Sequence, residues 1–303
     1  MKHIYILSSL LLLLTACAHT RKTQTSPVSF QGATAIDQRG DLLLLGEHPR
    51  TDLQRLPFAT WFDRNYAAYT VDTNTANLLT PLLANHTFKI FMGTWCGDSQ
   101  REVPRMLKIL DDCHVPSNHI HIIMLDYRDS VYKQSPGHEE KGEDIHHVPD
   151  LIVMDESGEN GRIIESPVVS LEKDLLVISR SAPYEPHYRA DYWLSAQFRT
   201  YPMDTLEKQF DALADTLKAK TEGEGELASY GRILLGEGDT AHAIFTCRLN
   251  TAVYPKSAFV NSFMGYILLK VQDPMGARKA FEKALALDPA DKRAGDYMAK
   301  HPD

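Results

Sequence analysis

Cysteine is scarce in this sequence, and the cysteines are too far apart to form a local redox pair. The 303 residues include Cys17, Cys96, Cys113 and Cys247, and no two of them have the spacing of a CxxC motif. This count and this spacing exclude a small fold stapled by disulfides. Any thiol chemistry would therefore depend on one sulfur at a time.

The sequence also lacks a basic excess, a phosphate-binding loop and a long apolar segment. A net charge of −8 argues against nucleic acid as a partner, because phosphate binding needs a basic surface. The glycines at 223–226 lack the strand and the Lys/Ser context of a phosphate loop. The apolar run Ile4–Leu14 has 11 residues. A helix of that length spans only ~16 Å, which is typical of a signal peptide rather than a membrane span.

The end of this apolar run indicates how the chain is processed. Leu14-Thr15-Ala16-Cys17 resembles the lipobox of bacterial lipoproteins, and the resemblance implies cleavage before Cys17 and lipidation of that residue. Residues 1–17 would then be a lipoprotein signal peptide and residues 18–31 a polar, flexible tether. The body of the protein would face the periplasm in the cell envelope, held to the membrane by the lipid alone, with the outer membrane favoured over the inner. The alternative is a plain secretory signal with an incidental cysteine.

A change in composition divides the rest of the chain at about residue 180. In residues 32–180, short apolar runs predict strands at 87–92, 119–125, 151–154 and 162–165, and amphipathic segments predict helices at 99–110 and 171–178. This alternation favours an α/β sandwich with a central sheet. Segment 40–83 precedes these elements, and its aromatic side chains are expected to pack an N-terminal extension against the sheet. Residues 183–303 are rich in Ala, Leu, Lys and Glu, which predicts helices throughout.

The helical part contains an internal repeat. Four pairs of residues are 34 positions apart, namely Gly231/Gly265, Ala243/Ala277, Cys247/Phe281 and Pro255/Pro289. The pattern resembles two tetratricopeptide repeats, at about 224–257 and 258–292, with a helix over 202–220 that caps them. The resemblance implies paired helices whose concave face could bind a protein partner.

A second constellation surrounds Cys96. The predicted strand 87–92 is followed by Trp95-Cys96-Gly97 and then by a helix, with Pro104 eight residues after the cysteine and Val148-Pro149 before the next strand. The arrangement resembles the active-site segment of the thioredoxin family over roughly residues 78–178. The resemblance implies a thioredoxin-like fold, with Cys96 as nucleophile at the start of a helix. It also implies a cis Val148-Pro149 peptide that lies beside the sulfur and contacts substrate. The helix dipole at that position favours a thiolate.

The motif departs from the family at two central positions. Ser99 replaces the second cysteine and Asp98 replaces the usual central residue, so the catalytic set would be Cys96 with Trp95, Gly97, Asp98 and Ser99. The resemblance implies a thiol-disulfide oxidoreductase without a resolving cysteine, which needs no cofactor and acts on a protein thiol or disulfide in the envelope. The alternative is a non-catalytic scaffold whose helical repeats bind a partner.

The remaining polar features are expected to have structural roles. Residues 138–147 hold three histidines and four carboxylates, but their spacing fits no recognised metal site, so we expect a solvated insertion beside the thiol. Arg162 is expected to form a surface salt bridge, and the alternative is that it neutralises charge near the thiol site. Cys113 is predicted to lie at a helix end and Cys247 in the core of a repeat.

Overall fold

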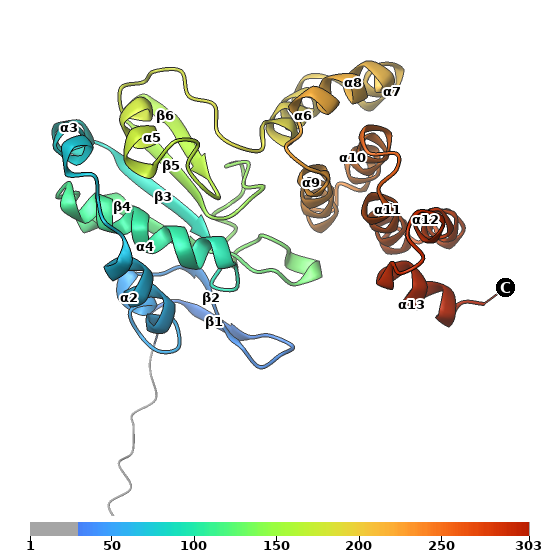
Figure 1. Cartoon of the computed structure of the whole chain (residues 1–303), viewed down its shortest axis with the longest axis horizontal. Helices are drawn as coiled ribbons and strands as arrows, with labels where there is room; N and C mark the ends of the chain where they lie inside the picture. Colours follow the sequence, from blue (N-terminus) through green and yellow to red (C-terminus); the bar gives the residue numbers. More distant parts are fainter. Residues whose placement is uncertain (1–29, 303) are drawn as a thin grey trace, which may run out of the picture.

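The structure, a computed structural model, describes residues 30–302. Cys17, the signal segment and nearly all of the tether lie outside the described residues. An α/β region, from β1 to α5, is followed by a helical region, from α6 to α13 (Figure 1). The prediction of an α/β part followed by a helical part is confirmed at this level.

Six strands form one mixed sheet in the order β1-β2-β4-β3-β5-β6. Strand β3 is parallel to β4 and antiparallel to β5, while the other neighbouring strands are antiparallel. The strands are β1 Ala33–Ile36, β2 Leu42–Glu47, β3 Thr87–Met92, β4 Ile120–Met124, β5 Asp150–Asp155 and β6 Gly158–Ile164. Strands β1 and β2, which were not predicted from the sequence, extend the sheet beyond β4.

The helices of the α/β region share one apolar core with one face of the sheet. Alternate residues of β3, Phe88, Ile90 and Met92, point into this core, where α2 packs against α4 and α3 against α5. Phe91 faces the other way and packs against Ile145 and other residues of a second cluster. The helices are α1 Arg50–Leu53, α2 Ala59–Ala68, α3 Thr73–Leu83, α4 Gly97–Asp112 and α5 Leu171–Ile178. The aromatic side chains of α2 do pack into the core, as the sequence predicts.

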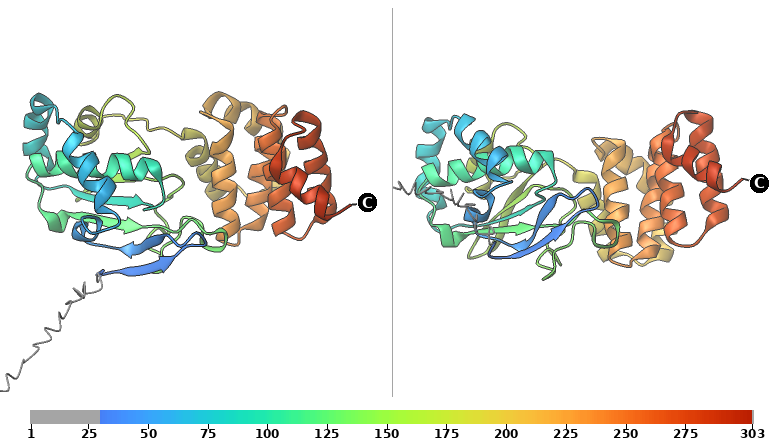
Figure 2. Two further views of the ribbon diagram at one scale, coloured as in Figure 1. Left: turned by 60° about the horizontal axis from the view of Figure 1, so that its bottom comes forward. Right: turned by 90° about the horizontal axis from the view of Figure 1, so that it is seen from below.

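The helical region stands beyond one end of the sheet (Figure 2). Its helices are α6 Arg189–Thr200, α7 Met203–Lys208, α8 Phe210–Lys220, α9 Glu224–Gly236, α10 Thr240–Val253, α11 Ala258–Lys270, α12 Pro274–Leu287 and α13 Lys292–Lys300. The single helix predicted over 202–220 is wrong, because the chain breaks at Gln209 into α7 and α8. None of the described helices is long and apolar enough to cross a membrane.

The 34-residue period corresponds to close packing within two helical hairpins. A Cβ on Gly231 of α9 would lie 2.8 Å from Cys247 Sγ of α10, and a Cβ on Gly265 of α11 would lie 2.6 Å from the Phe281 ring of α12. Each glycine therefore makes room for a side chain on the partner helix. Cys247 and Phe281 are both buried, so they occupy equivalent core positions.

Candidate thiol site between the two regions

Cys96 lies at the junction of β3 and α4. Its N–H donates to Gly93 O (3.0 Å), and its carbonyl accepts from Gln100 N (3.0 Å), so Cys96 is the N-cap residue of α4. Ser99 Oγ accepts from Gly93 N (3.2 Å), and Ser99 is fully buried. The predicted strand, turn and helix are present, and the Ser99 hydroxyl is used to hold the turn.

The thiol points at the segment that precedes β5. Cys96 Sγ donates to Val148 O at 3.2 Å, and the Val148–Pro149 peptide is cis. Cys96 is partly exposed, whereas Val148 is buried. Two features separated by 52 residues in the sequence are thus brought together, as the sequence analysis predicts.

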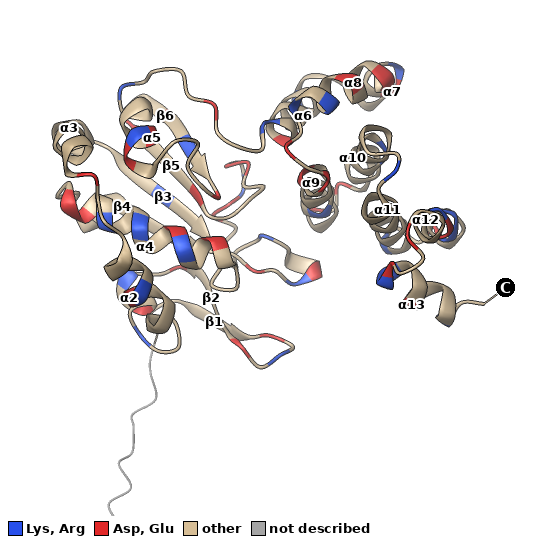
Figure 3. Ribbon diagram, in the orientation of Figure 1, with Lys and Arg blue, Asp and Glu red and all other residues tan. Residues whose placement is uncertain are grey.

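The other residues of the motif surround the sulfur in different ways. Trp95 Nε1 donates to Leu125 O (2.8 Å), which fixes the indole against the end of β4. Asp98 pairs with Arg101 (2.7 Å) in the first turns of α4, a helix that carries residues of both charges along its length (Figure 3). A Cβ on Gly97 would meet nothing within 4 Å. The backbone next to the thiol is therefore open to an approaching group.

The space in front of Cys96 is a pocket of about 500 Å³ whose walls come from both regions. The α/β region contributes Trp95 and Val148. The opposite wall is formed by Tyr188 and by the start of α9, at Gly225 and Ser229. The sequence analysis did not place the helical region at the thiol.

The insertion 138–147 was expected to be solvated, and this prediction is wrong for its last residues, which are buried. His146 and His147 are buried against the helical region, where His146 lies between Tyr192 of α6 and Tyr230 of α9. His147 Nε2 lies 2.9 Å from Asp191 Oδ2, and its Nδ1 lies 3.3 Å from Glu165 Oε1. The His147 ring stacks on Tyr188 with 3.8 Å between ring centres.

The buried side chains of His147, Asp191 and Glu226 shift one another's pKa values. Burial lowers the pKa of His147, but the nearby Asp191 carboxylate outweighs it and raises that pKa above its ordinary value. Burial likewise opposes ionisation of Asp191, yet the two histidines lower its pKa to about 2. Burial and the charge of Asp191 raise the pKa of Glu226, on α9, to about 7. Asp191 and His147 thus favour each other's charged form, and their contact joins the two regions.

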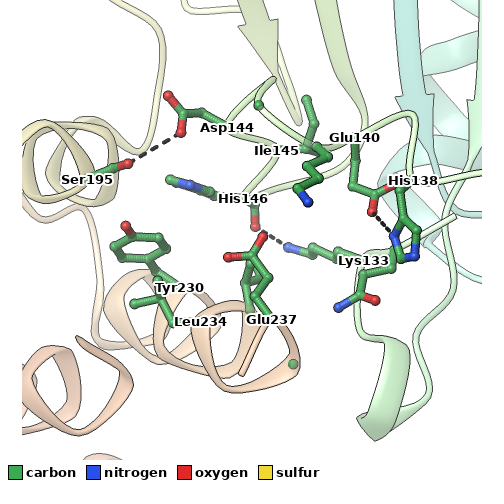
Figure 4. Close-up of a pocket in the computed structure, with 15 residues that line it drawn as sticks. Lys133, His138, Glu140, Asp144, Ile145, His146, Ser195, Tyr230, Leu234 and Glu237 are labelled. Carbon is green, nitrogen blue, oxygen red and sulfur yellow. Dashed lines mark hydrogen bonds and ion pairs between the residues drawn. The ribbon is translucent and has the colours of Figure 1, made fainter. Parts of the chain in front are cut away.

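Lys133 connects the thiol pocket to a second pocket of about 510 Å³ on the other side of the insertion (Figure 4). The Lys133 ammonium donates to His146 O and to Ser229 Oγ (3.1 Å). Asp144 accepts from Ser195 in the same pocket (3.3 Å). Polar contacts therefore join this part of the chain to the helical region at both pockets.

Arg162 takes part in both of the interactions considered for it. It forms a salt bridge with exposed Glu159 (2.6 Å), and it also pairs with Asp150 (3.0 Å), which is fully buried directly after Pro149. Burial raises the pKa of Asp150 to about 6, although the Arg162 charge opposes the change. Tyr192 of α6 donates to the same carboxylate (3.2 Å). The strand behind the thiol is thereby tied to the helical region.

The other two described cysteines lie away from this site and are buried. Cys113 follows α4 as its C-cap, and burial raises its pKa. Cys247 lies in the helical core, where burial raises its pKa to about 12. Both positions agree with the structural roles that the sequence predicts. Within residues 30–302, no group of His, Cys, Asp and Glu side chains is arranged to hold a metal ion.

Sequence reasoning found the thiol and its facing peptide but missed their surroundings. The missed residues are His147, Glu165, Tyr188, Asp191 and Glu226. The available signal was the position of His146-His147 directly before Val148-Pro149, since two histidines next to a site residue are candidates for a role there. Comparison of the chain with protein-family profiles, with curated proteins and with solved structures finds no match.

Proposed function

We propose that this chain is a thioredoxin-like thiol-disulfide exchange protein of the bacterial cell envelope that uses the single thiol of Cys96. The proposal depends on one observation, the 3.2 Å contact of Cys96 Sγ with Val148 O at the start of α4. Among the described residues, Cys96 is the one cysteine that is not buried, so its sulfur can meet a disulfide from solution. The mixed sheet, the cis Val148–Pro149 peptide and the paired helices of α9–α12 are consistent with a thioredoxin-like domain followed by tetratricopeptide repeats.

The exchange takes place in two balanced steps. The Cys96 thiolate attacks one sulfur of a disulfide, which forms a mixed disulfide and releases the other sulfur as a thiolate. Ser99 stands where a resolving cysteine would lie, so a thiolate from solution must attack the mixed disulfide. This attack regenerates the Cys96 thiolate and leaves a new disulfide in solution. The protein gains and loses no electrons over the cycle.

Alkylation followed by disulfide exchange tests the proposal. Iodoacetamide at neutral pH should modify the Cys96 peptide of the folded protein and leave Cys113 and Cys247 unmodified, as read by peptide mass spectrometry. Oxidised glutathione should then form a mixed disulfide with unmodified protein and with a Cys113→Ser control, but not with Cys96→Ser. A folded protein whose Cys96 reacts with neither reagent would contradict the proposal.

The proposal includes anchoring through Cys17, which lies outside the described residues. It is supported by the lipobox-like Leu14-Thr15-Ala16-Cys17. Several acyl chains on one cysteine would hold the protein firmly at the membrane. In fractionated cells, Cys17→Ala should move the protein from the membrane to the soluble fraction, whereas Cys113→Ala should leave it in place.

A second candidate is a scaffold in which the helical region recruits a protein partner. The observation that favours it is a groove of about 640 Å³ formed by α11 and α13 and lined by Phe259, Leu269 and Arg293. Phe259 and Leu269 are exposed, and such apolar side chains together are typical of protein contacts. If this function is correct, Phe259→Asp should abolish co-purification of an envelope partner, and Cys96→Ser should retain it.

A further inference from the structure

The thiol pocket is closed on one side by the helical region. Tyr188, Gly225 and Ser229 face Trp95 and Cys96 across a space of about 500 Å³. That volume is in the range of pockets for small molecules. A folded protein partner, in contrast, needs a contact area of roughly 800 Å² on each side. The arrangement therefore limits what can reach the sulfur.

The wall is held by polar contacts at the edge of the pocket. The Tyr188 hydroxyl donates to Glu165 of the α/β region. Ser229 of α9 receives a hydrogen bond from Lys133 (3.1 Å), and Asp191 of α6 pairs with buried His147 (2.9 Å). Breaking a buried pair leaves an uncompensated polar group, so the closed arrangement resists opening.

A separate contact fixes α9 from outside the pocket. Arg232 donates to Asp129 and to Tyr127 O (3.1 Å), and its guanidinium lies 3.8 Å from the ring centre of Tyr132. Arg232 does not line the pocket. Tyr132, on which it packs, does line the pocket, but replacing Arg232 removes no group that itself faces the sulfur.

The two regions meet without a shared apolar core. The clusters of the α/β region contain residues between 30 and 184, and those of the helical region contain residues between 190 and 298. The boundary is thus held by hydrogen bonds, ion pairs and ring contacts such as that of His147 with Tyr188, so removal of a single polar contact is expected to ease its opening.

From these observations we infer that the helical region is the specificity-determining wall of the Cys96 site, and that it admits low-molecular-weight disulfides and thiols while excluding disulfides of folded proteins. This inference rests on the proposed exchange at Cys96 and names its substrate class. Both the attacked disulfide and the resolving thiol are then small molecules. The protein substrate that the family resemblance implies would be excluded while the wall is closed.

The test compares exchange rates with oxidised glutathione and with insulin. The unmodified protein should react with glutathione disulfide and only slowly with the insulin disulfides. Arg232→Ala should raise the insulin rate by about tenfold or more, because opening becomes easier, and should leave the glutathione rate within about twofold. Arg248→Ala is the matched control, since Arg248 pairs with Glu207 inside the helical region (2.5 Å), and it should change neither rate.

Two results would overturn the inference. Comparable rates with insulin and glutathione disulfide in the unmodified protein would show that the wall does not select. An insulin rate unaffected by Arg232→Ala and by a second variant, Asp191→Ala, would show that these contacts do not control access. Failure of Cys96 to react with either disulfide would overturn the exchange function itself, and the inference with it. Circular dichroism on each variant establishes that it is folded before its rates are compared.

Discussion

Glu226 gives the helical region a stability that depends on pH, and this effect can be measured. Only 2% of Glu226 is exposed. One carboxylate oxygen accepts from Ala190 N (2.8 Å) and the other from Glu222 N (2.9 Å). The carboxylate thus joins the start of α6 to the start of α9. Its burial, next to Asp191, raises its pKa from 4.5 to about 7.

The sign and the size of the effect follow from this difference. The folded state holds the Glu226 proton more tightly than the unfolded state, so its contribution to stability is complete below the unfolded pKa of 4.5. The contribution is lost as the pH rises through about 7. At 1.36 kcal/mol per pH unit, the loss amounts to about 3 kcal/mol. His147 changes stability in the same direction, because its raised pKa also favours the folded state only while the imidazole is protonated.

Urea unfolding followed by far-ultraviolet circular dichroism is a suitable assay. The free energy of unfolding should fall between about pH 5 and about pH 8, and Glu226→Gln should remove about 3 kcal/mol of that fall. The amide loses one acceptor toward Glu222 N, which lowers stability by about 1 kcal/mol equally at every pH and leaves the slope unaffected. The control is Glu224→Gln, an exposed position two residues earlier in the same helix. If Glu226→Gln and the unmodified protein have the same slope, the buried-carboxylate reasoning is wrong.

Three further predictions concern buried positions. Gly265→Ala should lower the free energy of unfolding by about 1–3 kcal/mol, because its Cβ would lie 2.6 Å from the Phe281 ring, and Phe281→Leu in the same chain should restore part of it. Arg162→Met should cost about 3–5 kcal/mol in urea unfolding by leaving Asp150 buried without its counter-ion, and a double change with Asp150→Leu should recover most of the loss. If the single and double variants are equally unstable, the ion-pair explanation fails. Cys247, whose pKa burial raises to about 12, should react with a thiol probe only in denaturant, and labelling of the native protein would contradict its core position.

Local sequence patterns correctly predicted the strands and helices that are determined by the hydrophobic periodicity of their own residues. The strand 87–92 matches β3 residue for residue, and helix 171–178 matches α5. The 34-residue period identified Gly231 and Gly265, because close contact between helices requires a residue without a side chain at a fixed place in each hairpin. Cys96 and Val148 were paired correctly because both are fixed by turns at the ends of neighbouring strands.

The errors occurred where burial depends on a distant part of the chain. His146 and His147 are polar and follow a run of charged residues, so nothing local indicates that they are buried against the helical region. Arg162 does pair with exposed Glu159, but the contact of its guanidinium with Tyr192 depends on α6 and has no local signal. A histidine or arginine side chain can be solvated in a loop or buried with a hydrogen-bonded, oppositely charged partner. Which of the two occurs depends on whether a distant residue supplies that partner.

The Val148 carbonyl, which accepts the hydrogen bond from Cys96 Sγ, directly follows His146 and His147 in the chain, and both imidazole rings contact Asp191. Asp191 on α6 lies 2.9 Å from His147 and 3.5 Å from His146. The next residue is Val148, whose oxygen meets Cys96 Sγ. A small tilt of α6 would pull on both rings and displace this oxygen through a single peptide unit. The geometry at the sulfur is therefore coupled mechanically to the orientation of a helix some 95 residues further along the chain.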